Sequence, residues 1–108
     1  MKIYLAEKIT GDPHYLRKFQ SAQEDLQNQG FTVINPADLP EGMSAADYMR
    51  ICFAMIDSAD VAAFLLDWSL SRGAMLEHSW CQYVGKQTMF LESMSFYRPF
   101  PGARVANE

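Results

Sequence analysis

The sequence predicts an α/β fold, a small doubly wound parallel sheet of the flavodoxin or Rossmann type, with four to five strands and helices on both faces. Two observations predict it. Short runs of aliphatic, aromatic and β-branched residues recur along the chain, as in strands that are buried on both faces. Segments with helical spacing of apolar residues separate these runs, and such alternation builds a parallel sheet through right-handed crossovers.

Four apolar runs are expected to be the strands. They have the sequences KIYLA, FTVIN, DVAAFLL and QTMFLE and lie at residues 2–6, 31–35, 60–66 and 87–92. Each run is short and rich in β-branched, aromatic or aliphatic residues, which suits a strand covered by helices on both sides.

Three helices are expected between these strands. The first has Asp12 as its expected cap and Gly30 as its stop, and the second is expected to begin after Ser44 as its cap. The third is expected at residues 69–84, where it ends at Gly85.

One domain is expected at residues 1–92, followed by an irregular arm at residues 93–108. The chain has 108 residues, of which 49% are apolar, and this suits one hydrophobic core. The arm contains two prolines and three aromatic residues. Packing of these aromatic side chains on their own domain is favoured over contact with a neighbouring subunit.

The composition excludes several classes of partner. A formal net charge of −4 at pH 7 disfavours binding to nucleic acid or to an anionic membrane. Cys52 and Cys81 lack zinc-ribbon spacing and are expected to be buried thiols in a reducing, cytoplasmic setting. His14 and His78 lack metal-ligand spacing, so no metal is expected. No signal peptide is expected at the amino end, and no membrane-spanning stretch is expected, because the apolar runs are too short.

Ligands of doubly wound sheets bind beyond the carboxyl ends of the strands, near the point where the strand order reverses. The loops expected at that edge are residues 7–12, 35–43 and 67–73. The third of these loops leads into the most informative segment of the sequence.

Gly73 and Glu77 lie four residues apart, one turn of the expected third helix, and share a face. Glycine costs about 1 kcal/mol relative to alanine inside a helix, and the simplest reason for it is space beside the carboxyl group. The helix amino terminus, the Ser71 hydroxyl and the Arg72 guanidinium together suit an anion. The helix dipole favours the ionised form of Glu77, a candidate nucleophile or base.

Each of these residues also has a purely structural interpretation. Ser71 can be only an N-cap, Gly73 a packing requirement, Arg72 a solvated side chain and Glu77 an exposed residue in a surface pair. Their combination at the carboxyl edge of a parallel sheet favours the functional interpretation.

Three stretches resemble the nucleoside 2-deoxyribosyltransferase superfamily, in particular a small bacterial and phage branch. They are MKIYLA at the amino end, INP after the second strand, and the spacing Ser71-x-Gly73-x-x-x-Glu77 followed by VGK. The resemblance covers about residues 1–92.

The resemblance implies a double displacement. The glutamate of the motif, here Glu77, attacks the anomeric carbon, expels the base and holds the sugar as a glycosyl ester, which a second base or water resolves. A serine at position 71 is similar to what is found in the branch of the superfamily that hydrolyses nucleoside monophosphates. Together with Arg72, Ser71 therefore favours a phosphorylated substrate. Tyr4 matches an aromatic hydroxyl that orients the carboxylate, although core packing explains it equally well. No cofactor is implied.

Two positions depart from the superfamily pattern. Glu7 stands where relatives usually carry glycine, and its carboxylate could repel a phosphate or bind a ribose hydroxyl. Cys52 stands where an acidic residue assists the leaving base, and a thiol protonates a base poorly at neutral pH. Asp60 or Asp67 could substitute, and Asp67, on the ligand side of the sheet, is chosen as the general acid.

Two further residues are candidates for binding the substrate. Trp68 could stack on a base or close the core, and Asn35 could bind a ligand or cap its own turn.

The expected function is therefore transfer or hydrolysis of the base of a (deoxy)nucleoside or nucleoside monophosphate. A non-catalytic nucleotide-binding sensor module is the alternative, which Glu7 and Cys52 motivate, and an NAD or ADP-ribose glycohydrolase is a weaker third. The expected partners are this small molecule and further copies of the chain in a homo-oligomer, a dimer or higher, in which Ser93, Ser95 or Tyr97 could complete a neighbouring site.

Overall fold

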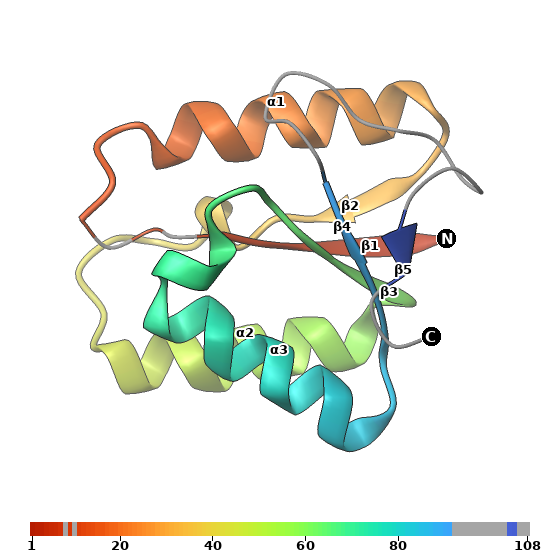
Figure 1. Cartoon of the computed structure of the whole chain (residues 1–108). Coiled ribbons are helices and arrows are strands. Elements are labelled where there is room, and N and C mark those ends of the chain that lie inside the picture. The colour runs from red at the N-terminus through yellow and green to blue at the C-terminus, as the bar shows by residue number, and fades with distance from the viewer. Residues whose placement is uncertain (8, 10, 92–103, 106–108) are drawn as a thin grey trace.

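A five-stranded sheet lies at the centre of the computed structural model, which describes residues 1–7, 9, 11–91 and 104–105 (Figure 1). Its strands are β1 Lys2–Ala6, β2 Thr32–Ile34, β3 Val61–Phe64, β4 Gln87–Phe90 and β5 Arg104–Val105. They are arranged in the order β2-β1-β3-β4-β5, and the first four run parallel. The predicted doubly wound α/β fold is confirmed.

The carboxyl-terminal segment joins the sheet through β5, which pairs antiparallel with β4. Sequence patterns had indicated only an irregular arm at residues 93–108, so a strand at 104–105 is an addition to that prediction. The rest of this arm lies outside the described residues, as do the predicted contacts of Ser93, Ser95 and Tyr97.

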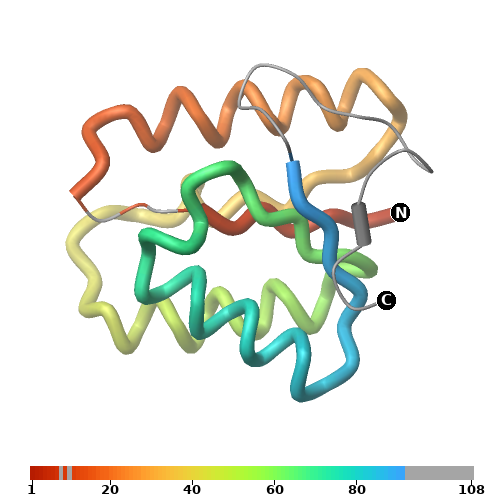
Figure 2. Tube along the Cα trace, viewed as in Figure 1, coloured from red at the N-terminus to blue at the C-terminus, as the bar shows by residue number. Residues whose placement is uncertain are grey.

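The strand order reverses beside β1. The chain passes from β1 to β2 on one side and then crosses back to β3 on the other side. The loops that follow these three strands gather at one edge, at the left of the trace in Figure 2, and the amino terminus lies at the opposite edge. This is the switch point at which parallel sheets bind ligands.

One helix covers the first face of the sheet. Helix α1, Tyr15–Asn28, buries Phe19, Ala22 and Leu26 against it. The expected cap at Asp12 is wrong, because α1 begins after His14. Asp12 instead accepts the His14 backbone N–H at 2.8 Å through one carboxylate oxygen, and its other oxygen lies 2.7 Å from the Lys18 ammonium.

Two helices cover the opposite face. Helix α2, Ala45–Ser58, begins as predicted after Ser44, whose hydroxyl accepts the Asp47 backbone N–H at 3.1 Å. Helix α3, Arg72–Val84, begins later than predicted, because residues 68–70 form the short 3₁₀ helix η2, Trp68–Leu70. A second 3₁₀ helix, η1, Pro36–Asp38, follows β2.

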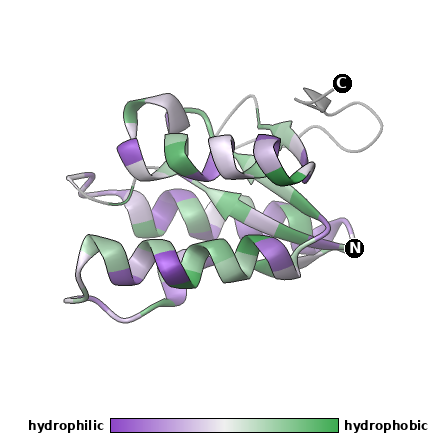
Figure 3. Ribbon diagram, turned by 90° about the horizontal axis from the view of Figure 1, so that it is seen from below, coloured by the Kyte–Doolittle hydropathy of each residue, from purple (hydrophilic) through white to green (hydrophobic). Residues whose placement is uncertain are grey.

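The sheet separates two hydrophobic cores, and the strands are accordingly apolar on both faces. Ile3 and Leu5 point toward α1, and Tyr4 and Ala6 point toward α2 and α3. Figure 3 shows that the strands are largely hydrophobic and that the helices carry both hydrophilic and hydrophobic residues. Within the described residues, none of the helices is long and apolar enough to cross a membrane.

The end of α3 generates a prediction about stability. Gly85 has φ 77° and open space around the position of a β-carbon, so a substitution there is opposed by backbone strain alone. We expect Gly85→Ala to lower the free energy of unfolding by about 1 kcal/mol, and Gly85→Asn to lower it less, because asparagine tolerates this conformation better. Urea unfolding of the three proteins measures the ranking. Equal stability of the alanine variant and the wild type would contradict it.

Candidate active site

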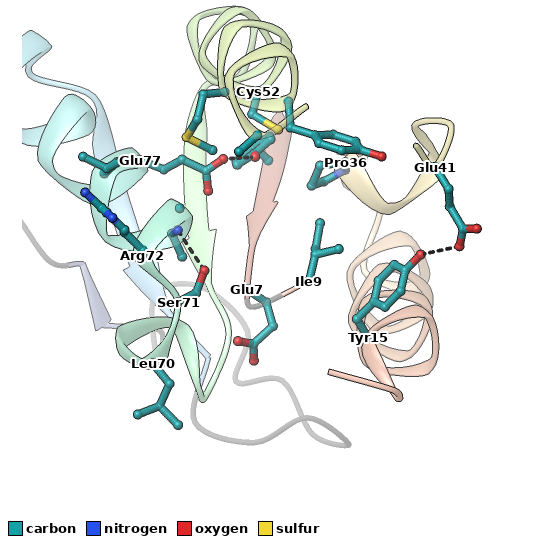
Figure 4. A pocket seen from close by; sticks show the side chains of 17 residues that line it. Glu7, Ile9, Tyr15, Pro36, Glu41, Cys52, Leu70, Ser71, Arg72 and Glu77 are labelled. Carbon is teal, nitrogen blue, oxygen red and sulfur yellow. Dashed lines mark hydrogen bonds between the residues drawn. The ribbon is translucent and has the colours of Figure 1, made fainter. Parts of the chain in front are cut away.

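A cavity of about 790 Å³ opens at the carboxyl edge of the sheet. Its walls come from β1 and the loop after it, from the start of α1, from residues 36–49, from Cys52, and from residues 70–77. Figure 4 shows Glu77, Ser71 and Arg72 along one side of this cavity, with Tyr15 and Glu41 on the opposite side. The three loops expected at this edge all contribute residues to it.

Glu77 is a buried carboxyl group at the wall of this cavity. Only 4% of its surface is exposed, so the alternative of an exposed surface pair is wrong. The Tyr4 hydroxyl donates a hydrogen bond of 2.6 Å to Glu77 Oε2. Tyr4 is itself fully buried between β1 and the helices, so it is a core residue and also a partner of the carboxyl group.

Burial controls the protonation of this pair. Desolvation raises the pKa of Glu77 to about 7, and the hydrogen bonds from Tyr4 and Cys52 oppose that rise only in part. The expectation that the helix dipole favours the ionised form therefore needs correction, because burial outweighs the dipole at the second turn of α3. Burial also holds the pKa of Tyr4 well above its usual range, so its hydroxyl remains a donor.

Cys52 is the third member of this cluster. It lies on α2, close to both Tyr4 and Glu77. Burial raises the pKa of Cys52 to about 11, so the thiol stays neutral at physiological pH. The thiol is too weak an acid to protonate a leaving base efficiently.

Gly73 allows a close approach between helices. A β-carbon at this position would lie 3.3 Å from the terminal methyl carbon of Met49, closer than ordinary van der Waals contact. The space predicted beside Glu77 is thus shared between the cavity and a methionine from α2.

Ser71 and Arg72 lie at the amino end of α3 and line the cavity. The Ser71 hydroxyl accepts the Ala74 backbone N–H at 3.1 Å, so its interpretation as an N-cap is confirmed. The Arg72 side chain is exposed to solvent.

Glu7 also lines the cavity and is buried. Its Oε2 accepts the backbone N–H of Asp67 at 3.1 Å, which links the loop after β1 to the loop after β3.

Three predicted site residues lie outside the residues that line this cavity. The Asp67 carboxylate lies 3.3 Å from the Lys18 ammonium, and the structure does not bring it to Glu77. Trp68 packs against Phe64 and Phe90, as its core interpretation expects.

Asn35 is the third predicted site residue that does not line the cavity. Its side chain caps η1 by accepting the Ala37 N–H at 2.9 Å, and it donates to Gln23 at 2.8 Å.

Sequence reasoning missed the opposite wall of the cavity. The Tyr15 hydroxyl donates to Glu41 at 3.1 Å, and the Tyr48 hydroxyl donates to the Pro40 carbonyl at 2.6 Å. Tyr48 could have been found, since it lies four residues before Cys52 and shares its helix face. No local pattern pairs Tyr15 with Glu41, because the contact joins segments that are 26 residues apart.

In the part of the chain that the structure describes, there is no group of three or more histidine, cysteine, aspartate or glutamate side chains that could hold a metal ion.

Solved structures with this fold provide the first comparison. A 2-deoxyribosyltransferase from Bacillus psychrosaccharolyticus is 23% identical, with a TM-score of 0.68 over 84% of this chain and 72% of that chain. A CMP N-glycosidase from Clostridium botulinum is 19% identical, with a TM-score of 0.64 over 84% and 71%. A 2-desoxiribosyltransferase from Leishmania mexicana is 18% identical, with a TM-score of 0.66 over 98% and 78%. The predicted relation to deoxyribosyltransferases is thus confirmed at the level of the fold.

Comparisons of the sequence itself give a family but no assigned activity. The family model described as "Domain of unknown function (DUF4406)" matches residues 1–90. None of the curated proteins matches the chain.

The buried carboxyl group generates a prediction about pH and stability. The pKa of Glu77 is about 7 in the folded chain against an ordinary value of 4.5. Above pH 4.5 the unfolded chain releases this proton while the folded chain retains it, so stability falls until the pH has passed through the folded pKa. We expect a total loss on the order of 3 kcal/mol.

Urea unfolding between pH 4 and pH 8, on the wild type and on Glu77→Gln, isolates this effect because glutamine does not titrate. The wild type should lose stability relative to the variant as the pH rises. Parallel curves would contradict the prediction.

Proposed function

The chain belongs to the family described as "Domain of unknown function (DUF4406)", and from this premise we propose that it is an N-glycosidic-bond enzyme with Glu77 as its nucleophile. It transfers or hydrolyses the base of a (deoxy)nucleoside or nucleoside monophosphate. The observation that carries the proposal is the buried Glu77 carboxyl group at the wall of a cavity of about 790 Å³, hydrogen-bonded to Tyr4. A cavity of this volume falls within the range of small-molecule sites.

The chemistry follows from the properties of the carboxyl group. In its ionised form Glu77 attacks the anomeric carbon, and the bond from that carbon to the base breaks with its electron pair leaving on the base. The departing base takes up a proton from solvent water, and the sugar remains as an ester of Glu77. Water or a second base then attacks the same carbon and restores the carboxylate, which gives hydrolysis or transfer with retained configuration.

Tyr4 acts in this scheme as a positioning residue. Its hydroxyl holds Glu77 Oε2 at 2.6 Å, which limits rotation of the carboxyl group. It also stabilises the ionised form and so keeps the pKa of Glu77 from rising further. Both effects favour attack at neutral pH.

The two named activities among the structural neighbours, a deoxyribosyltransferase and a CMP N-glycosidase, support this reaction class. A homo-oligomer is the assembly that we propose with it. Leu70 and Leu76 line the cavity and yet are 70% and 49% exposed, which favours coverage by another copy of the chain.

A nucleotide-binding module without catalysis is the second candidate. The observation in its favour is Cys52, because a neutral thiol with a pKa of about 11 stands beside Glu77 where an acid would assist the leaving base. Such a module would bind a nucleotide stoichiometrically in calorimetry and leave it unchanged.

Replacement of the nucleophile is the direct test. We expect Glu77→Gln to reduce base release from deoxynucleosides or their 5′-monophosphates by at least about a thousandfold, since the variant lacks the attacking group. Chromatography of free base measures the rate. Glu24→Gln, which removes an exposed carboxylate outside the cavity, is the matched control and should retain wild-type activity. Absence of release by the wild type across the whole panel would refute the enzyme proposal.

The pH profile tests the state of the nucleophile. Because the ionised form attacks and the pKa of Glu77 is about 7, kcat/KM should rise with pH and level off above that value. In Tyr4→Phe the midpoint should move to higher pH, because the hydrogen bond that stabilises the carboxylate is lost. A profile whose midpoint is unchanged in this variant would show that Tyr4 does not act through Glu77.

A further inference from the structure

The geometry of the reaction determines where the leaving base must lie relative to Glu77. The nucleophile attacks the anomeric carbon from the face opposite to the bond that breaks, so the attacking oxygen, the carbon and the departing nitrogen are roughly in line. Figure 4 shows Glu77 on one side of the cavity and Tyr15 and Glu41 on the opposite side. A sugar held between the two sides therefore directs its base toward the opposite wall, which carries Tyr15 and Glu41.

Two tyrosines form the aromatic part of this opposite wall. Tyr15 lies at the start of α1 and Tyr48 lies on α2, so their side chains reach the cavity from helices on different faces of the sheet. Both side chains are half-buried. Among the described residues that line the cavity, the third aromatic residue is Tyr4, whose hydroxyl is already bonded to Glu77.

The hydroxyl groups of both tyrosines are bonded to the same short segment of the chain. The Tyr15 hydroxyl donates to Glu41 at 3.1 Å, and the Tyr48 hydroxyl donates to the Pro40 carbonyl at 2.6 Å. Because Pro40 and Glu41 are adjacent in the sequence, the two bonds bring both phenol groups to one part of the wall. With their polar ends bonded to the protein, the two side chains offer a ligand mainly their aromatic rings.

Aliphatic side chains continue this apolar surface toward the nucleophile. Ile9 and Pro36 line the cavity, and Figure 4 shows both between Glu77 and Glu41. A flat aromatic base on this side of the cavity meets rings and aliphatic groups. Stacking on aromatic side chains is available to every nucleobase, because each has a π face, and it requires no particular pattern of donors and acceptors on the edge of the base.

We propose that Tyr15 and Tyr48 form the subsite for the leaving base and bind it through contact with their aromatic rings. The chain then accepts different bases, and it binds purines more tightly than pyrimidines because a purine offers a larger flat surface. This inference rests on the proposed function and refines it, since it names the feature of the substrate that the opposite wall recognises.

The experiment separates the rings from their hydroxyl groups. kcat and KM for base release are measured with deoxyadenosine and thymidine, as nucleosides or as 5′-monophosphates according to which form the wild type accepts. The variants are Tyr15→Phe, Tyr15→Leu, Tyr48→Phe and Tyr48→Leu. Phenylalanine keeps the ring and removes the hydroxyl, whereas leucine keeps apolar bulk and removes the ring. Tyr83→Leu is the matched control, because Tyr83 is 88% exposed and lies outside the cavity lining.

Each leucine variant should raise KM for the purine substrate by about tenfold and KM for the pyrimidine substrate by less, while kcat changes by less than about threefold, since binding is lost and Glu77 is intact. The phenylalanine variants and the control should remain within about twofold of the wild type. Leucine variants with unchanged KM, or phenylalanine variants that lose as much as the leucine variants, would overturn the inference. A purely structural effect of leucine would raise KM for both bases alike, so equal changes also overturn it.

Calorimetry with deoxyadenosine and with free adenine separates this inference from the proposed function, because binding requires no turnover. If the wild type releases no base but binds these ligands, and the leucine variants bind them about tenfold more weakly, the enzyme proposal fails and the base subsite stands. If the wild type is active and the leucine variants bind as tightly as it does, the enzyme proposal stands and the subsite fails. Binding of neither ligand by the wild type overturns the subsite. Where circular dichroism shows that a leucine variant does not fold, the phenylalanine variant at that position decides, and binding weakened tenfold there overturns the inference.

Discussion

The hydrogen bond from Tyr4 to Glu77 is the contact on which the rest of the site depends. It joins β1 to α3 across 73 residues of sequence and places a carboxyl group where solvent hardly reaches it. A buried carboxyl group needs a donor, and the fully buried Tyr4 hydroxyl needs an acceptor. The pair satisfies both needs and leaves Glu77 with a pKa of about 7, at which it can change protonation state during a reaction.

Much of the fold could be predicted from the sequence because it depends on local patterns. Apolar runs indicated the four parallel strands, and Ser44 and Gly85 marked helix ends through capping chemistry that acts within a few residues. The predicted start of α1 was wrong because Asp12 accepts the His14 backbone N–H before the helix begins and forms an ion pair with Lys18. Those contacts compete with capping, and the pattern alone cannot show which one forms.

The residues of α3, of β1 and of the loop after β1 were the predictable part of the cavity wall. The spacing of Ser71, Gly73 and Glu77 along α3 predicted that they lie together at this edge of the sheet, and all three line the cavity. The pKa of Glu77 could not be predicted, because it depends on burial beneath α2 and on Tyr4. Asp67 was misplaced for a similar reason. The position of Asp67 after a strand does not reveal that its carboxylate forms an ion pair with Lys18 on α1.

Lys18 connects several segments that surround the cavity. Its ammonium lies between the carboxylates of Asp12 and Asp67, so α1 is tied at once to the segments that follow β1 and β3. Glu7 also accepts the backbone N–H of Asp67, so the loops after β1 and β3 are connected to each other as well as to α1. The segment after β2 is also attached to α1, through the contacts of Asn35 with Gln23 and of Glu41 with Tyr15, and to α2 through the contact of Pro40 with Tyr48. All three loops at the carboxyl edge are therefore cross-linked to the helices that cover the sheet, so a ligand in the crevice would meet walls that side-chain contacts already hold in place.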